Sequence, residues 1–324
     1  MKNEFSFIKF VKDVKDVKDE FYHQKDNKCL FFDYFMKRRI VLIGVPSNLG
    51  VDISGSNFGP DKIRQFLIPE LEKNNINFVD LGNLFVSEKN FLGDSNEKLK
   101  NLTSIQRVYR NYSRLPENFL EKPNFPIILG GDHSIIFGHI KELTKKKNAG
   151  LIWFDAHGDF NDEFTTLTGN IHGMVLGAIA GNSLKKYFDV DKPLIKEKNI
   201  SLLGARDLDL NEIFLLKNSD VMVISTEKLK ENKMEYISQA INRANDETSG
   251  YHVSFDLDFV DPLDAPGVSV PVNEGISKEE FSNIVDLIDT DKLLSVDFVE
   301  LNPLNDIDDK TVKLIVDSIL KLCK

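Results

Sequence analysis

The chain has 324 residues, of which 41% are hydrophobic and 28% are charged, and its formal net charge is −10 at pH 7. This composition is typical of a globular protein, and no apolar run approaches the roughly 20 residues that cross a bilayer, so we expect no membrane span. The excess of acidic residues disfavours nucleic acid as a partner and favours a small cationic ligand.

Residues 1–38 differ in composition from the rest of the chain. Residues 11–19 repeat the triplet Val-Lys-Asp, which alternates charge and carries little apolar surface. We predict a charged N-terminal extension here, either a solvated helix or a partly disordered segment, followed by one large domain over residues 39–324.

Two features of the sequence favour a cytoplasmic protein. The first 13 residues lack the apolar segment and the small-residue cleavage site of a secretory signal. The two cysteines, Cys29 and Cys323, lie near opposite ends and offer neither a disulfide framework nor a cysteine-based zinc site.

From Arg39 onward, short apolar runs alternate with amphipathic stretches. The runs predict strands at Ile40–Val45, Phe78–Leu81, Ile127–Leu129, Leu151–Phe154, Ile200–Leu203, Val221–Ile224, Tyr251–Phe255 and Leu294–Phe298. Helices are expected at Asp61–Lys73, Glu97–Arg114, Ile135–Lys146, Glu235–Ala244, Lys278–Asp289 and Thr311–Leu322. Strands that are apolar at every position suit a sheet buried on both faces, so we predict an α/β fold in three αβα layers around a mainly parallel sheet.

Polar residues with metal-binding chemistry follow two of these strands. Asp155, His157 and Asp159 come directly after Leu151–Phe154 and share one side of an extended chain because they are spaced by two. Asp256 and Asp258 follow Tyr251–Phe255 in the same way, and two such carboxylates would repel strongly without a cation. Both groups lie at strand carboxyl ends, where ligands of parallel sheets gather.

A third strand ends in Gly130-Gly-Asp-His-Ser134, whose glycines permit a tight turn that can present His133 to the same crevice. Together the three motifs offer four carboxylates and two imidazoles. This thiolate-free set favours a hard divalent ion such as Mn²⁺, and the number of ligands suits two ions better than one.

Each motif also has a structural interpretation when it is taken alone. An Asp-x-Asp pair after a strand could serve as a turn or a helix cap, and a single histidine is usually a packed or surface residue. The joint appearance of three motifs at strand ends favours metal binding. By contrast, we expect His23, His139 and His252 to be structural or surface residues, although His252 shares a strand face with Asp256 and could support a ligand.

These motifs resemble those of the ureohydrolases, the family containing arginase, agmatinase and formiminoglutamase. The signatures are Gly130-Gly-Asp-His-Ser134, Asp155-Ala-His-Gly-Asp159 and Ser254-Phe-Asp-Leu-Asp-Phe-Val-Asp-Pro262, and the resemblance covers Ile40 to Leu322. It implies an arginase-like fold for residues 39–324 and two Mn²⁺ per subunit. One ion would be held by His133, Asp155, Asp159 and Asp256, and the other by His157, Asp155, Asp256 and Asp258.

The resemblance also implies roles around the metal centre. His172 stands where arginases keep a histidine for proton transfer, and Glu300 matches the glutamate that binds the guanidinium. Asn161, Thr168 and, more weakly, Thr166 match positions that bind the substrate α-carboxylate. Asp209 and Glu212 match those that receive its α-amino group. Binding both the α-carboxylate and the α-amino group of the substrate is the feature that distinguishes arginase from agmatinase.

The implied reaction is hydrolysis of L-arginine to L-ornithine and urea by a hydroxide that bridges the metals and attacks the guanidinium carbon. Asp159 would relay the proton of this nucleophile, and His172 would protonate the departing amine. The alternatives are agmatinase or another hydrolase of guanidino or formimino substrates, a catalytically silent arginine sensor, and a metal-dependent deacetylase.

Two positions depart from the arginase pattern. Val270 stands where many arginases have threonine, so a hydroxyl near the substrate is missing. Glu279 and Glu280 replace an Arg-Glu pair that makes subunit contacts in many arginases. The resemblance implies a homo-oligomer, a trimer or a hexamer, but these two residues leave its form open.

Overall fold

The protein is described here from a computed structural model that covers residues 38–87 and 98–323. Apart from Arg38, the charged extension predicted over residues 1–38 therefore lies outside the described residues. Among the helices of the two described ranges, none is long and apolar enough to cross a membrane.

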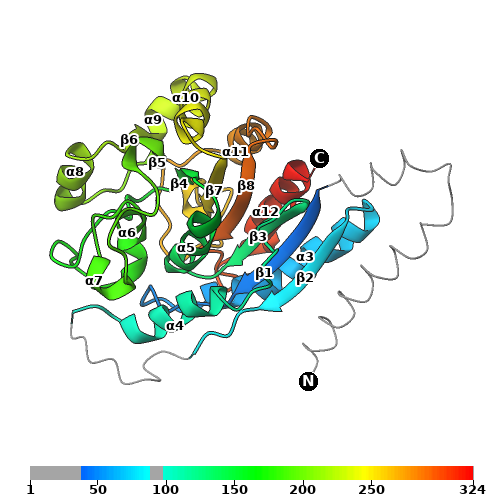
Figure 1. Cartoon of the computed structure of the whole chain (residues 1–324). Coiled ribbons are helices and arrows are strands. Elements are labelled where there is room, and N and C mark those ends of the chain that lie inside the picture. The colour runs from blue at the N-terminus through cyan, green and yellow to red at the C-terminus, as the bar shows by residue number, and fades with distance from the viewer. Residues whose placement is uncertain (1–37, 88–97, 324) are drawn as a thin grey trace.

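Eight parallel strands form a single sheet, and each coincides with one of the predicted apolar runs (Figure 1). They are β1 (Arg39–Val45), β2 (Phe78–Asn83), β3 (Asn124–Gly130), β4 (Gly150–Phe154), β5 (Ile200–Ala205), β6 (Met222–Ser225), β7 (Tyr251–Asp256) and β8 (Leu293–Val299). Their spatial order is β2-β1-β3-β8-β7-β4-β5-β6. The central strands are buried on both faces, which explains why their sequences are apolar at nearly every position.

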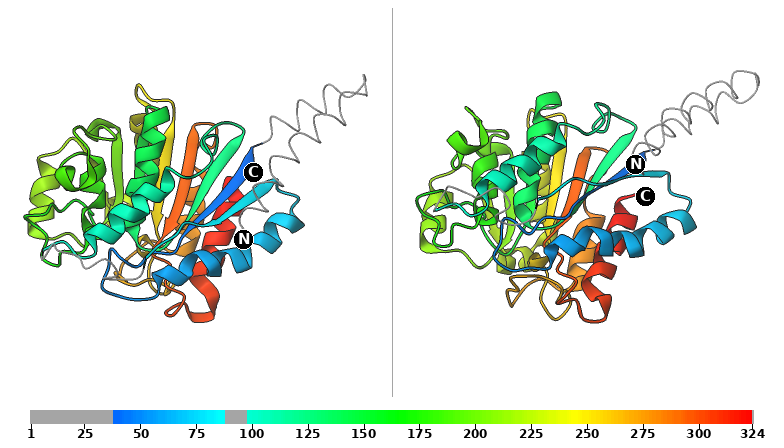
Figure 2. Two further views of the ribbon diagram at one scale, coloured as in Figure 1. Left: turned by 60° about the horizontal axis from the view of Figure 1, so that its bottom comes forward. Right: turned by 90° about the horizontal axis from the view of Figure 1, so that it is seen from below.

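Helices cover both faces of the sheet (Figure 2). One face carries α4 (Leu102–Tyr112), α5 (Ile136–Lys146), α6 (Val175–Ile179), α7 (Lys185–Phe188) and α8 (Leu210–Lys217). The other face carries α3 (Gly59–Lys73), α9 (Thr226–Glu231), α10 (Lys233–Asn245), α11 (Lys278–Asp286) and α12 (Lys310–Leu322). The predicted three-layer α/β architecture is confirmed.

Alternation along β1 shows how the sheet separates two hydrophobic cores. Val41 and Ile43 join the core beneath α4 and α5, whereas Ile40 and Leu42 join the core beneath α3 and α12. All four side chains are buried, and full burial of an aliphatic side chain contributes about 1.5–3 kcal/mol. These two cores fix the strands on which the candidate site is built.

The predicted helix at Glu97–Arg114 is shorter in the structure. Glu97 lies outside the described residues, and α4 begins only at Leu102 because Asn101 has a left-handed φ of 52° that cannot continue a helix. Asn101 instead donates a 2.9 Å hydrogen bond from its side chain to the carbonyl of Leu49, which ties the start of α4 to the loop after β1.

The strand order determines where the candidate site lies. β3, β8, β7 and β4 are neighbours at the centre of the sheet, although they come from distant parts of the sequence. Each of the four is followed by candidate functional residues at its carboxyl end. Four polar segments therefore meet at one edge of the sheet, which is where ligands of open parallel sheets bind.

Candidate metal centre

The loop after β3 depends on close backbone packing. A Cβ atom on Gly131 would lie 2.0 Å from the carbonyl oxygen of Ser47, so only glycine fits here. Neither Gly130 nor Gly131 has a positive φ, so these glycines permit close approach of two loops rather than a left-handed turn. Asp132 then accepts hydrogen bonds from the Ser47 hydroxyl at 2.7 Å and from the Ser134 N–H at 3.0 Å, which fixes the residues that flank His133.

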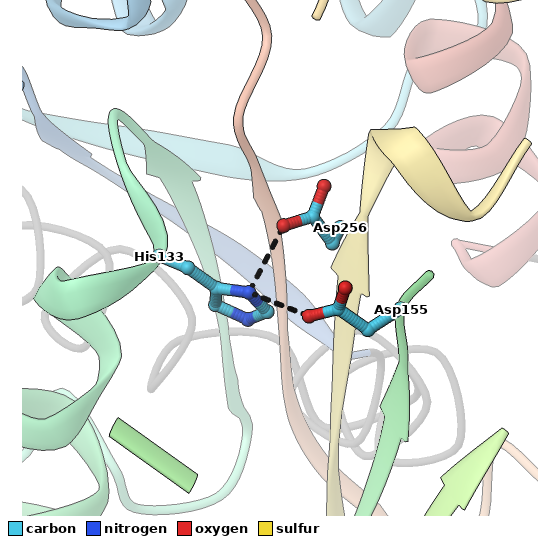
Figure 3. Close-up of side chains that lie close together, drawn as sticks. All are labelled: His133, Asp155 and Asp256. Atoms are coloured by element: carbon cyan, nitrogen blue, oxygen red, sulfur yellow. Dashed lines mark ion pairs between the residues drawn. The ribbon is translucent and has the colours of Figure 1, made fainter. Parts of the chain in front are cut away.

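The first side-chain cluster gathers around Nδ1 of His133. This atom lies 3.1 Å from Oδ2 of Asp256, 3.2 Å from Oδ2 of Asp155 and 3.3 Å from Oδ2 of Asp159. Figure 3 shows His133, Asp155 and Asp256 pointing toward one another from three different segments of the chain. All four residues are buried, and the ligand atoms of His133, Asp155 and Asp256 are close enough to hold one metal ion, with Asp159 beside them.

The second cluster gathers around Nδ1 of His157. This atom lies 3.1 Å from Oδ2 of Asp258 and 3.5 Å from Oδ1 of Asp155. Asp258 is held in turn by the Ala156 N–H, which donates to its Oδ1 at 3.2 Å. Asp155, His157 and Asp258 therefore form a second group that can hold a metal ion.

Asp155 belongs to both clusters and presents one carboxylate oxygen to each. Its Oδ2 accepts a 2.9 Å hydrogen bond from the Trp153 indole, and its Oδ1 accepts one of 2.7 Å from the His157 N–H. The indole also stacks on the His133 imidazole, with centroids 3.9 Å apart and planes inclined by 7°. Asp256 faces His133 with Oδ2, while its Oδ1 accepts the N–H of Asp258, a member of the second cluster, at 2.9 Å.

The buried carboxylates of the two clusters repel one another, and this repulsion shifts their pKa values. Burial and the neighbouring Asp155 raise the pKa of Asp159 to about 6. Burial and the nearby Asp258 and Asp155 raise the pKa of Asp256 well above its ordinary value. Burial alone would lower the pKa of His133, but hydrogen bonds to the surrounding carboxylates raise it instead. A bound cation would remove this repulsion, so the charges favour metal binding.

Glu300 and His172 meet beside the first cluster. Oε1 of Glu300 accepts a 2.8 Å hydrogen bond from the His133 N–H and lies 3.3 Å from Nδ1 of His172. Its other oxygen, Oε2, is buried and has no hydrogen-bond partner. Burial alone would lower the pKa of His172, but Glu300 raises it to about 9. The imidazole is therefore charged at neutral pH in the protein without metal.

Two of these residues adopt backbone conformations that non-glycine residues rarely take. Asp159 has a φ of 50° and Glu300 a φ of 61°, both in the left-handed region. Each costs on the order of 1–3 kcal/mol, and such strain persists where the surrounding structure enforces it. Both carboxylates contact His133, Asp159 at its imidazole and Glu300 at its backbone N–H.

The predicted substrate residues form a second polar group on the rim. Asp209 caps α8 by accepting the Glu212 N–H at 2.9 Å, while its other oxygen accepts the Asn161 amide at 2.9 Å. Glu212 is buried and accepts the Phe160 N–H at 2.9 Å. Burial raises the pKa of Glu212 to about 8, and the nearby Asp159 and Asp209 add to this shift.

Thr166 and Thr168 lie in the loop that follows Asn161. The hydroxyl of Thr166 accepts the Gly169 N–H at 3.0 Å, and that of Thr168 accepts the Asn170 N–H at 3.1 Å. Both hydroxyls keep a hydrogen to donate. Their predicted contact with a substrate carboxylate stays a prediction, and the structure does not bring either into contact with the metal clusters.

Several supporting residues were not predicted from the sequence. They include Trp153 and Ser254, which contact the ligands Asp155 and His133, and Arg206, whose guanidinium donates to the carbonyl of Asp258 at 2.6 Å. The signal for Ser254 was present, because polar residues recur at every second position of a strand that is otherwise buried.

The chain matches the model of the Arginase family over residues 38–324. It is 36% identical to an arginase of Brevibacillus brevis over 287 residues, which is 87% of this chain and 96% of that protein. The crystal structure of arginase from Bacillus cereus superimposes with a TM-score of 0.81 at 34% identity, covering 88% of this chain and 98% of that one. The arginase of Entamoeba histolytica, solved in complex with L-ornithine, gives a TM-score of 0.80 at 27% identity and covers 89% and 99%.

Proposed function

The chain belongs to the arginase family of hydrolases, which act on amidine C–N bonds, and on this premise we propose that it hydrolyses L-arginine to L-ornithine and urea with two Mn²⁺ per subunit. Residues 39–324 would form the catalytic domain. The observation that carries the proposal is the buried, unpartnered Oε2 of Glu300, which lies beside two clusters of metal-binding side chains.

The donor set fits two divalent ions. The first would be held by His133, Asp155, Asp159 and Asp256, and the second by His157, Asp155, Asp256 and Asp258. Oxygen and imidazole donors without thiolate favour Mn²⁺ among the common ions. When bound, a pair of such ions lowers the pKa of a shared water and supplies hydroxide at neutral pH.

Glu300 is suited to orient a planar cation. Its Oε1 is already occupied by the His133 N–H, so Oε2 remains for charge-assisted hydrogen bonds with a guanidinium. A guanidinium held there would have its carbon next to the clusters around His133 and His157. Attack of hydroxide on that carbon would then take place within one bound complex rather than between two freely diffusing molecules.

The proton transfers fall to two side chains. Oδ2 of Asp159 faces the first cluster and can accept the proton of the attacking water. His172 lies beside Glu300, which favours its protonated form, and is only partly buried, so it could protonate the departing amine and regain a proton from solvent. Together they would complete the cleavage of the C–N bond.

Recognition of the amino-acid head favours arginine over agmatine. The acidic Asp209 and Glu212 would receive the α-ammonium group, and the donors of Asn161, Thr166 and Thr168 would bind the α-carboxylate. Agmatine has no carboxylate for the second group to bind. The Entamoeba histolytica relative with L-ornithine, the product of arginine hydrolysis, supports the same assignment.

A urea-release assay tests the proposal most directly. The Mn²⁺-loaded protein is given L-arginine, agmatine and guanidinobutyrate side by side, and formamide release is followed with formiminoglutamate. We expect the highest kcat/KM with L-arginine, and a preference for another substrate would overturn the specificity while leaving the metal site intact. Absence of turnover with all four would favour a silent arginine-binding protein. A cytoplasmic location and a trimeric or hexameric assembly stay predictions.

The variant Asp209→Asn tests recognition of the amino-acid head group separately from cleavage of the C–N bond. Asparagine can still cap α8 by accepting the Glu212 N–H, whereas alanine would remove the cap and disturb the helix. We expect kcat/KM for L-arginine to fall about 10- to 100-fold, in line with loss of one charged contact of roughly 1.5–3 kcal/mol. Activity with a guanidino substrate that lacks the amino-acid head should be unchanged.

A further inference from the structure

A row of polar side chains crosses the hydrophobic layer between the sheet and α5, below the metal centre. Its members are His252 and Ser254 of β7, Ser295 and Asp297 of β8, and His139 of α5, all of them fully buried. The register of β7 and β8 pairs His252 with Ser295 and Ser254 with Asp297, so alternate residues of both strands share one face. Burying so many polar groups is costly unless every link is satisfied.

Hydrogen bonds join this row to a metal-binding side chain. Nε2 of His133 lies 2.8 Å from Oγ of Ser254, and that hydroxyl donates to Oδ1 of Asp297 at 2.8 Å. Oδ2 of Asp297 lies 2.6 Å from Nε2 of His252. Three links therefore connect His133 to a histidine that touches no residue of either metal cluster.

The direction of these hydrogen bonds is set by metal binding. His133 faces the carboxylates with Nδ1, which has no hydrogen-bond partner, so a bound cation requires the lone pair on that atom and the proton on Nε2. Ser254 must then accept from His133 and donate to Asp297. The structure has the second of these bonds in this direction, with Oδ1 of Asp297 accepting from the Ser254 hydroxyl.

His252 completes the arrangement by donating to the second oxygen of Asp297. Without this donor, Oδ2 of a fully buried carboxylate would have no partner, which is costly, and the carboxylate would be free to turn toward another donor. The hydroxyl of Ser254 would then lose its acceptor on Asp297 and could donate to Nε2 of His133. In that arrangement the proton of His133 stands on Nδ1, where it opposes metal binding.

We propose that His252 is a positioning residue for His133, acting through Asp297 and Ser254 to keep the Nδ1 lone pair directed at the metal cluster. The proposal rests on the proposed function, because it assumes that a metal ion occupies the cluster around His133. His157 makes no contact with the row in the structure, so the effect is confined to the first ion.

His139 provides a matched control at the far end of the row. Its Nε2 lies 2.8 Å from Oγ of Ser295, while its Nδ1 has no partner. The hydroxyl of Ser295 lies 2.7 Å from Nδ1 of His252 and can keep that contact without His139. The variant His139→Leu therefore removes a buried histidine of the same layer and leaves the pair of His252 and Asp297 intact.

The experiment is a Mn²⁺ titration of the metal-free protein by calorimetry, with free Mn²⁺ followed by electron paramagnetic resonance. For His252→Leu we expect one of two ions to bind about 10- to 100-fold more weakly, the usual effect of losing a group that supports a ligand. His139→Leu should bind both ions as the unmodified protein does. His252→Gln, whose amide can replace Nε2–H as donor to Asp297, should recover most of the affinity.

Two double variants show which of the two ions is bound more weakly in His252→Leu. The loss caused by His252→Leu should persist when combined with His157→Ala and disappear when combined with His133→Ala. Equal weakening of both ions, or a loss in His139→Leu as large as in His252→Leu, would indicate general loosening of the layer and overturn the proposal. If His252→Leu does not fold by circular dichroism, Asp297→Asn carries the same test.

The outcomes also separate this inference from the proposed function. If the unmodified protein binds no Mn²⁺, the metal assignment itself fails. If it binds two ions and His252→Leu binds them equally well, only the role of His252 is wrong.

Discussion

Oε1 of Glu300 lies 3.3 Å from Nδ1 of His172 and also accepts the backbone N–H of His133, so one oxygen links the proposed proton donor to the first metal cluster. The pair comes from residues 128 positions apart in the sequence. It leaves Oε2 of Glu300 as a buried acceptor without a hydrogen-bond partner beside the first cluster.

Glu300→Gln should lower the pKa of His172 from its present value of about 9, because burial favours the neutral imidazole once the carboxylate charge is removed. The glutamine Oε1 can still accept the His133 N–H. An NMR titration of His172 in the metal-free protein measures the shift, and kcat/KM for L-arginine should fall at least about 100-fold in parallel. An unchanged titration would mean that Glu300 does not set the charge of His172.

Mn²⁺ should stabilise the protein against heat, because it relieves the repulsion among Asp155, Asp159 and Asp256. At 100 times the dissociation constant, one ion adds about 2.7 kcal/mol to the free energy of unfolding, which corresponds to roughly 5–10 °C in melting temperature. Differential scanning calorimetry with Mn²⁺ and with a chelator measures the gain. Asp256→Asn should lose most of it, and the exposed Asp317→Asn should keep it.

Glu212 should make the metal-free protein less stable as pH rises. Its pKa is about 8 in the folded state against an ordinary value of 4.5, so its stabilising contribution is complete below pH 4.5 and is lost as pH rises through 8. The loss is on the order of 5 kcal/mol. Denaturant unfolding at pH 5, 7 and 9 should show that Glu212→Gln, which keeps the acceptor for Phe160, depends less on pH. The exposed Glu279→Gln should follow the unmodified protein, and parallel curves for both variants would contradict the prediction.

Gly131→Ala should disrupt the metal centre, because its Cβ atom would lie 2.0 Å from the Ser47 carbonyl and would push His133 away. We expect a loss of stability of about 1–3 kcal/mol, the usual cost of overpacking, together with weaker Mn²⁺ binding. Gly173→Ala is the control beside His172, because a Cβ atom there would meet nothing within 4 Å. Thermal unfolding and metal titration of both variants check the prediction, which fails if the two behave alike.

The sequence predicted the eight strands well because strands buried on both faces leave uninterrupted apolar runs, as in Leu151–Phe154. It also identified the segments that converge at the metal clusters, since each follows a strand end. The spatial order of the strands could not be predicted, because nothing in the local pattern places β8 between β3 and β7. The contact of Glu300 with the His133 N–H depends on that order.

Two further features could not be predicted from the sequence, because each depends on a tertiary contact. The reason for the glycines before His133 depends on where Ser47 lies, which is a tertiary relationship. The start of α4 at Leu102 depends on the left-handed Asn101, whose side chain is held by a loop from another part of the chain. Local periodicity contains neither piece of information.

Trp153 is the only tryptophan in the sequence, and its indole stacks on His133 while donating to Asp155. The fluorescence of the whole protein therefore originates largely at two of the proposed ligands. A cation arriving there changes the electric field across the ring, so the emission should shift or be quenched as the clusters fill. The intrinsic fluorescence of Trp153 should therefore report metal occupancy without an added label.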